Sequence, residues 1–350
     1  MMKRNTVISI LFVVVLMIAA NPAGAVVFIP NQAGFSGFVR PGVGVLDIET
    51  NMVAEFAGFK LSSDPISSLT ESNDSETTGI FLIPFNVQYT FNNLKTQVFL
   101  GTLLADLARF DLVQQLGVKQ KIGSLGLLQV GLQRSGIVTE VWEDPYVVNT
   151  GRSTTDRNLT GVQLVWDKIL GSDLELSLTA RSIEIDDEKS GESVGGLTAA
   201  QRSLLERDGD QKSIEALYVF KIEGGHVLVP SVKFVADDRD GDARANDAYS
   251  FKLTYSYLGD PLTVFVNGSI GKAEYDEVNP IPAFGMTKEQ EDDLYGAGLT
   301  ILYANPWNWS LWDSKPMRFY VEGAFLERDA NIDFYDEKVV SATAGVLFRW

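Results

Sequence analysis

A run of carboxylates beside a turn glycine is the segment whose chemistry is easiest to assign. In residues 237–242 (DDRDGD), carboxylates alternate at Asp238, Asp240 and Asp242. Calcium binds oxygen ligands at this kind of spacing, and a glycine allows the sharp turn that such a loop needs. The distal bidentate Glu of a full calcium loop is missing. Two interpretations stay open, a structural calcium site or solvated acidic turns, and the sequence indicates no other cofactor.

Composition leaves little room for catalysis. The chain has no cysteine, which excludes disulfides, thiolate metal sites and cysteine nucleophiles. Its single histidine, His226, follows Gly224 and Gly225 in a predicted turn, and we interpret it as a turn residue rather than a general base. The net charge of −17 argues against binding nucleic acid. The sequence therefore predicts a protein that is not an enzyme.

The first 25 residues have the layout of a secretory signal peptide. Lys3 and Arg4 precede the apolar run Ile8–Ala20, and the small residues 23–25 (AGA) follow it. As a helix this run would rise only about 20 Å, less than the ~30 Å hydrocarbon core of a bilayer. We expect cleavage after Ala25, export from the cytoplasm, and one mature domain over residues 26–350.

Alternation of apolar and polar residues predicts strands with two different faces. In Ser250–Tyr257 every second residue is apolar or aromatic, and Leu174–Arg181 follows the same pattern. A soluble sandwich and a membrane barrel both alternate in this way. The end of the chain favours the barrel, because Thr343, Gly345, Phe348 and Trp350 resemble the C-terminal signal by which the barrel-assembly machinery recognises outer-membrane barrels.

The fold class predicted is therefore all-β, an antiparallel transmembrane barrel of the Gram-negative outer membrane. Turn residues divide the mature chain into about fourteen strands, with twelve or sixteen as alternatives. The expected strands are 35–48, 80–91, 95–103, 109–119, 125–138, 160–169, 173–186, 213–223, 226–238, 247–258, 261–275, 293–303, 316–328 and 338–350.

Charge distinguishes the two ends of this barrel. Segments around the long connections hold 36 of the 46 acidic residues but only ten basic residues. We expect these acidic loops to be extracellular, beside outer-membrane lipid and lipopolysaccharide, where divalent cations would bridge like charges. Plain solvation of the loops is the alternative. Three tryptophans in the connection 304–315 (Trp307, Trp309 and Trp312) suit an interfacial aromatic girdle.

The strand parity assigns charged residues to the lumen. The lumen-facing set is Glu175, Arg181, Lys221, Lys233, Lys252, Arg318 and Glu322, with Asp167, Glu215 and Arg349 also on inward positions. These residues predict a weakly cationic interior. Their charges either select solutes or merely form pairs across strands.

Four stretches resemble an uncharacterised Gram-negative family, a domain of unknown function with predicted outer-membrane membership. They are residues 34–37 (GFSG), 97–102 (QVFLGT), 142–147 (WEDPYV) and 188–193 (EKSGES). The resemblance spans most of the mature chain and implies an independent β-barrel family without assigned site residues. Trp142 and Tyr146 in the third stretch form either an aromatic gate or a self-packed loop.

Three functions fit this sequence. The first is a passive channel for a small solute, porin-like or gated, because a barrel of this size has a lumen that side chains need not fill. The second is a closed surface barrel with a structural or binding role through its acidic loops. The third, transport of hydrophobic cargo, requires Val26–Pro30 to plug the lumen. The solute and the oligomeric state do not follow from the sequence.

Removal of Phe348–Trp350 tests the terminal signal. We expect the truncated chain to assemble poorly, because its last strand loses both the recognition motif and the aromatic anchor. The measurement is the fraction of heat-modifiable protein in the outer-membrane fraction. Normal insertion of the truncated chain would contradict this assignment.

Overall fold

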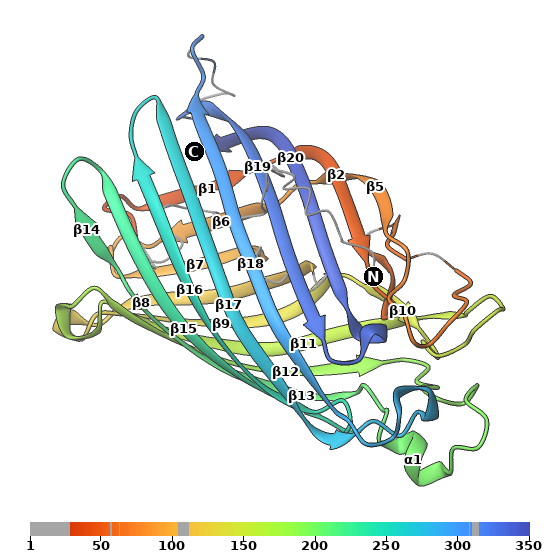
Figure 1. Cartoon of the computed structure of the whole chain (residues 1–350). Coiled ribbons are helices and arrows are strands. Elements are labelled where there is room, and N and C mark those ends of the chain that lie inside the picture. Colours follow the sequence, from red (N-terminus) through yellow and green to blue (C-terminus); the bar gives the residue numbers. More distant parts are fainter. Residues whose placement is uncertain (1–28, 57, 63, 104–111, 308, 310–314) are drawn as a thin grey trace.

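The computed structural model describes residues 29–350 apart from 57, 63, 104–111, 308 and 310–314. In this part the chain forms a closed antiparallel barrel of fourteen strands, as the sequence predicts (Figure 1). Each barrel strand is here called a stave, because some of them are divided into two shorter strands. The predicted signal peptide lies outside the described residues, as do Trp312 and Val26–Phe28 of the proposed plug.

The fourteen staves are built from seventeen of the twenty strands. Staves 1, 2 and 8 are each split in two, at Arg40-Pro41, Ile83-Pro84 and Val219, and proline interrupts a ladder because it lacks an N–H donor. Three short strands, β3, β4 and β10, belong to the long loops. In chain order the strands are β1 (Gly34–Val39), β2 (Gly42–Glu49), β3 (Val53–Phe56), β4 (Phe59–Lys60), β5 (Glu76–Leu82), β6 (Phe85–Thr90), β7 (Thr96–Leu103), β8 (Leu112–Lys121), β9 (Leu127–Ile137), β10 (Thr139–Trp142), β11 (Thr154–Asp167), β12 (Leu174–Ile185), β13 (Gly209–Tyr218), β14 (Phe220–Ile222), β15 (His226–Arg239), β16 (Asn246–Leu258), β17 (Leu262–Val278), β18 (Glu289–Ala304), β19 (Lys315–Ala330) and β20 (Glu337–Arg349).

Helical structure is confined to connections. The single α-helix of the described residues, α1 (Ala199–Ser203), begins with a capping box between Thr198 and Gln201. Four 3-10 turns complete the set: η2 (Gly123–Leu125), η3 (Ile169–Gly171), η4 (Pro282–Phe284) and η5 (Asp333–Tyr335). No helix in the described ranges has the length and apolarity needed to cross a bilayer.

The connections define two ends of the barrel. At one end, here called the turn end, neighbouring strands are joined by short turns, apart from the longer connection 305–314. Trp350 hydrogen-bonds to Gly37 at this end. The other end, the loop end, carries the long loops 50–75, 138–153, 186–208, 240–245, 279–288 and 331–336. Figure 1 shows α1 and these loops gathered at the end opposite the C-terminus.

Outward side chains form an apolar belt around the barrel. Leu178, Ile214, Phe234 and Tyr249 are register partners on four neighbouring strands, and all four are exposed. On β16 the alternate positions turn inward, as Ser256 does. Such a row would be unfavourable in water and is the lipid-facing surface of a transmembrane barrel.

Exposed aromatic residues gather at the turn end. Trp307 and Trp309 stack with ring centroids 4.8 Å apart and remain 61% and 55% exposed. On another part of the rim the ring centroids of Tyr218 and Phe220 are 4.6 Å apart. Aromatic rings of this kind lie at the bilayer interface, so an aromatic girdle lies at the turn end.

The ring is closed by pairing between the first and last staves. β2 pairs with β20 from Gly42 opposite Gly345 to Glu49 opposite Lys338, and β1 adds Phe38 opposite Arg349. Of the terminal-signal residues, Thr343 and Gly345 lie on the inward positions of β20, and Phe348 and Trp350 lie on the outward positions.

The strands are longer at the loop end than the sequence predicts. β11 begins at Thr154 rather than 160, β17 extends to Val278 rather than 275, and β18 begins at Glu289 rather than 293. These extensions carry many charged residues, because the ladder continues beyond the apolar belt. Apolar alternation marks only the part of a strand that meets lipid.

A tyrosine fills the space left by two glycines at the closing seam. A Cβ on Gly42 would overlap the hydroxyl of Tyr320, and one on Gly345 would lie 2.7 Å from its ring and overlap the carbonyl oxygen of Pro41. Tyr320 is buried and also lies under the guanidinium of Arg40, 4.0 Å from its ring centroid. The glycine of the terminal motif therefore has a packing role at the seam.

Gly345→Ala should destabilise the closed barrel by about 1–3 kcal/mol, because the added methyl group meets backbone that cannot move aside. The measurement is the urea midpoint of the heat-modifiable form in detergent. Gly268→Ala is the matched control, since the nearest atom to its added Cβ lies 4.0 Å away. Equal midpoints for the two variants would contradict the packing role of Gly345.

Candidate functional site

One wall of the lumen is polar and is held together by hydrogen bonds between strands. Gln115 of β8 donates to Gln163 of β11 at 2.9 Å. On the next strands Arg181 donates to the amide oxygen of Gln133 at 2.8 Å. These side chains are inward because their strand neighbours form the apolar belt. The wall thus carries donors and acceptors that could replace solute hydration.

The structure places the predicted lumen residues on two parts of the interior. Glu175, Arg181, Lys233 and Lys252 lie on the polar wall, on β12, β15 and β16. Lys252 approaches Glu215 at 3.6 Å. Lys221 lies at the turn-end rim, where its ammonium is 2.5 Å from Asp173.

The remaining predicted residues lie on the opposite wall, with β17–β20. Arg318 donates to Thr263 at 2.8 Å, and Glu322 forms an ion pair with Arg40. Arg40 was not among the predicted lumen residues, although its even position in β1–β2 matches the inward parity.

Apolar side chains fill part of this second wall near the turn end. The cluster consists of Phe38, Phe265, Leu302, Tyr320 and Leu347. All five occupy inward positions, so the alternation of an apolar outside and a polar inside does not hold here. The wall along β17–β20 and β1 therefore combines an apolar patch near the turn end with polar residues such as Arg318 and Glu322.

Long loops from all sides of the barrel meet in one buried cluster at the loop end. This cluster, here called the loop lid, contains Ile66, Tyr146, Leu197, Leu205, Ile281, Phe284, Ala330, Ile332, Phe334 and Tyr335. The loop with Tyr146 joins staves 5 and 6, and the loop with Tyr335 joins staves 13 and 14. These positions are nearly opposite in the ring, so loops that touch there must cross the barrel mouth.

Two tyrosines hold the centre of the loop lid. The hydroxyls of Tyr146 and Tyr335 are 2.8 Å apart, and Asn279 donates to Tyr335 at 2.7 Å. Both tyrosines are 1% exposed, and the ring centroids of Phe334 and Tyr146 are 5.4 Å apart. Burial raises the pKa of Tyr146 well above its ordinary value, and Tyr335 adds to this effect. The Tyr146 hydroxyl is therefore neutral at physiological pH.

Two of the four family-like stretches contact each other in these loops. The carboxylate of Asp144 accepts backbone N–H groups from Tyr146, Gly191 and Ser193 at 2.8–3.1 Å. Glu143 of the same stretch pairs with Lys189 at 2.7 Å. The sequence did not predict a role for these two stretches, because the residues that contact each other are more than 40 positions apart. Their role in the structure is to join loop 138–153 to loop 186–208.

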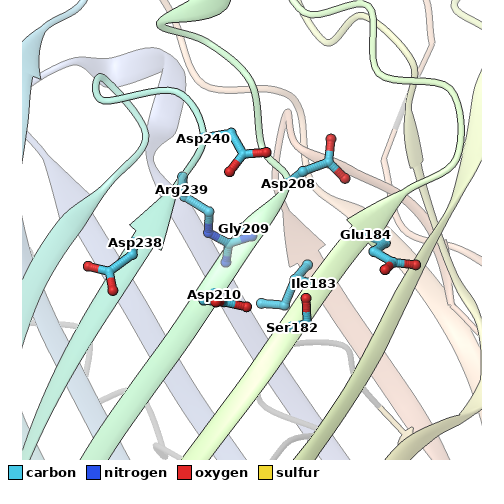
Figure 2. Close-up of a pocket in the computed structure, with 9 residues that line it drawn as sticks. All are labelled: Ser182, Ile183, Glu184, Asp208, Gly209, Asp210, Asp238, Arg239 and Asp240. Carbon is cyan, nitrogen blue, oxygen red and sulfur yellow. The ribbon is translucent and has the colours of Figure 1, made fainter.

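The residues considered for calcium do not converge on one point. Asp238, Asp240 and Arg239 line a pocket of 460 Å³ with Asp208 and Asp210, but Asp242 is exposed and lies outside it. Figure 2 shows the carboxylates of this pocket pointing in different directions. Asp238 is held by Lys212 at 2.8 Å. Within the described ranges no group of three or more acidic or histidine side chains is arranged to hold a metal ion.

The carboxylate of Asp336 makes the loop lid sensitive to pH. It accepts the N–H of Ala330 at 2.7 Å, and burial, with nearby Asp329, Asp333 and Glu49, raises its pKa to about 6. Because this pKa is above the ordinary value, the contribution of Asp336 to lid stability is largest below pH 4. It is lost as the pH rises through 6.

Asp336→Asn, which keeps the acceptor oxygen, should stabilise the lid at pH 7.5 and have little effect at pH 4. At pH 7.5 we expect the free energy of lid opening to rise by about 1 kcal/mol, a value reduced for solvent screening. The measurement is amide hydrogen exchange at Ala330 and Tyr335. Asp242→Asn, on an exposed position of another loop, is the control. The same difference between variant and wild type at both pH values would contradict the titration of Asp336.

Solved structures similar to this chain are outer-membrane proteins at low identity. OmpT, an outer membrane protein of Vibrio cholerae, has 11% identity and a TM-score of 0.40, over 93% of this chain and 100% of that one. The outer membrane channel DcaP of Acinetobacter baumannii has 10% identity and a TM-score of 0.42, over 91% and 99%. An anion-selective porin from Comamonas acidovorans has 12% identity and a TM-score of 0.37, over 91% and 100%.

These scores are too low to carry an argument about this chain, and the fold stands on its own hydrogen-bond register. No curated protein matches the sequence. A family model matches residues 34–349, which include all fourteen staves and the loop lid. The chain therefore belongs to the family described as protein of unknown function DUF2860.

Proposed function

We propose that this protein is a gated passive channel of the outer membrane for small polar solutes. The observation that carries the proposal is the polar part of the lumen wall, where Gln115, Gln163 and Arg181 face the lumen. Polar side chains are costly inside a dry protein core but are suited to a lumen that holds water. The polar wall thus supports a path for solutes along the barrel axis.

The loop lid supports gating rather than a permanently open pore. Its loops come from nearly opposite sides of the barrel and share one buried aromatic centre. A pathway through the mouth requires these loops to separate. Aromatic pairs are worth about 0.5–1.5 kcal/mol beyond their buried area, so the closed lid has a definite but limited stability.

A closed surface barrel is the second candidate, and the same lid favours it. A buried core formed by five loops is a rigid surface, and the surrounding segments are strongly acidic. Such a surface could bind lipopolysaccharide through divalent cations or contact a partner protein. In this alternative the lumen carries no solute, and the inward polar side chains only hydrogen-bond to one another.

The proposed location follows from the apolar belt and the aromatic residues at the turn end. In bacteria, closed barrels with such a belt occupy the outer membrane, with short turns in the periplasm and long loops outside. We infer this orientation here, with export by the segment 1–25 and assembly by the barrel-assembly machinery. A catalytic function is not part of the proposal.

Single-channel recording in planar bilayers tests the channel. We expect wild-type protein to show infrequent openings, and Phe334→Ala to raise the open probability several-fold. The reason is that Phe334 is fully buried between Tyr146 and Phe284, so its removal weakens the packing that holds the lid closed.

Phe81→Ala is the control, because Phe81 is exposed in the apolar belt. It should leave the openings of the wild type unchanged. Lys252→Glu should shift any conductance toward cations, since Lys252 lies on the polar wall. Electrical silence of both wild type and Phe334→Ala would contradict the channel and favour the closed surface barrel.

A further inference from the structure

Two buried carboxylates face each other on the polar wall near the turn end. Asp167, the last residue of β11, is the register partner of Glu175 on β12. Asp167 is 2% exposed and Glu175 is 7% exposed. One oxygen of each, Oδ2 of Asp167 and Oε2 of Glu175, has no hydrogen-bond partner. Desolvated carboxylate oxygens of this kind are costly unless a positive group or a donor meets them.

Two of the nearby cations, Lys221 and Lys252, are already paired with other acids. Lys221 is 2.5 Å from Asp173, and Lys252 is 3.6 Å from Glu215. The other oxygen of Asp167 accepts the backbone N–H of Lys168 at 2.7 Å. Within the described residues, no ion pair joins a lysine or arginine to Asp167 or Glu175. The local arrangement therefore leaves two carboxyl groups for a cation from outside the chain.

The flanking residues point to an organic cation. Asp167 pairs with Leu127 of β9, and Glu175 pairs with Leu217 of β13, so one row across four strands reads leucine, two carboxylates, leucine. Calcium requires six to eight oxygen ligands, which two carboxylates do not supply. An ammonium group has three N–H donors and can be held by two carboxylates, while an aliphatic stem covers the leucines.

We propose that Asp167 and Glu175 form a binding site for the protonated amino group of an aliphatic amine in the lumen. This names the class of solute for the proposed channel and in that respect rests on it. Binding itself does not require conduction. A closed barrel could hold the same amine, so the site can be tested apart from the channel.

The experiment is isothermal titration calorimetry of the intact protein in detergent with 1,4-diaminobutane. We expect saturable binding that weakens at least about tenfold in Asp167→Asn and in Glu175→Gln, because each variant removes one charge-assisted acceptor. Both substitutions keep the side-chain shape, and heat-modifiable migration verifies folding. Asp237→Asn is the matched control, since its carboxylate is held by Arg239 at 2.7 Å at the loop end.

Two further titrants separate the alternatives. The neutral analogue 1,4-butanediol should not bind, and calcium chloride should not displace the diamine at equal concentration. Equal affinity of wild type, Asp167→Asn and Glu175→Gln would overturn the site, as would absence of diamine binding. Calcium binding in place of the diamine would overturn the amine assignment. Diamine binding without conductance would refute the channel and keep the site.

Discussion

Closure of the hydrogen-bond ladder is the constraint on which the rest of the structure depends. In a hydrocarbon environment every backbone N–H and C=O must find a partner within the protein, so the first and last staves have to pair. That pairing brings Gly42 and Gly345 together and leaves the space that Tyr320 occupies. Tyr320 in turn supports Arg40, which pairs with Glu322. The seam therefore determines the composition of the lumen wall beside it.

Ring closure also brings the loops within reach of one another. Each long loop starts on a fixed stave, and loops from nearly opposite staves meet at Tyr146 and Tyr335. The lid is stable because it buries its own aromatic core and satisfies polar groups such as Asp144 internally. A mouth covered in this way separates the lumen from the outside. The polar wall beneath it would have no contact with external solutes unless the loops moved apart, which is why gating and closure are the two functions that the geometry supports.

The strand pattern was predictable because membrane barrels expose a period-two signal on every stave. Parity alone distinguishes Phe251 outside from Ser256 inside, and the terminal motif is local in sequence. Parity is silent on what fills the interior. Phe38 and Phe265 are apolar but point inward, because they pack in one buried cluster inside the barrel rather than against lipid. For the loop lid, the sequence predicted only that Tyr146 belongs to an aromatic gate or a self-packed loop. Its partner Tyr335 was not predictable, because this contact joins distant residues and depends on ring closure.

The distribution of charge links the two ends of the barrel. Acidic residues dominate the loop end, where they raise the local concentration of cations by their field. Most basic residues of the lumen wall are paired with acids, as Lys252 is with Glu215 and Arg40 with Glu322. Asp167 and Glu175, at the turn end of the polar wall, have no such ion pair among the described residues, and each keeps one carboxyl oxygen without a hydrogen-bond partner. Once the lid opens, a cation drawn to the acidic loops would pass these pairs before it reached the site proposed at Asp167 and Glu175.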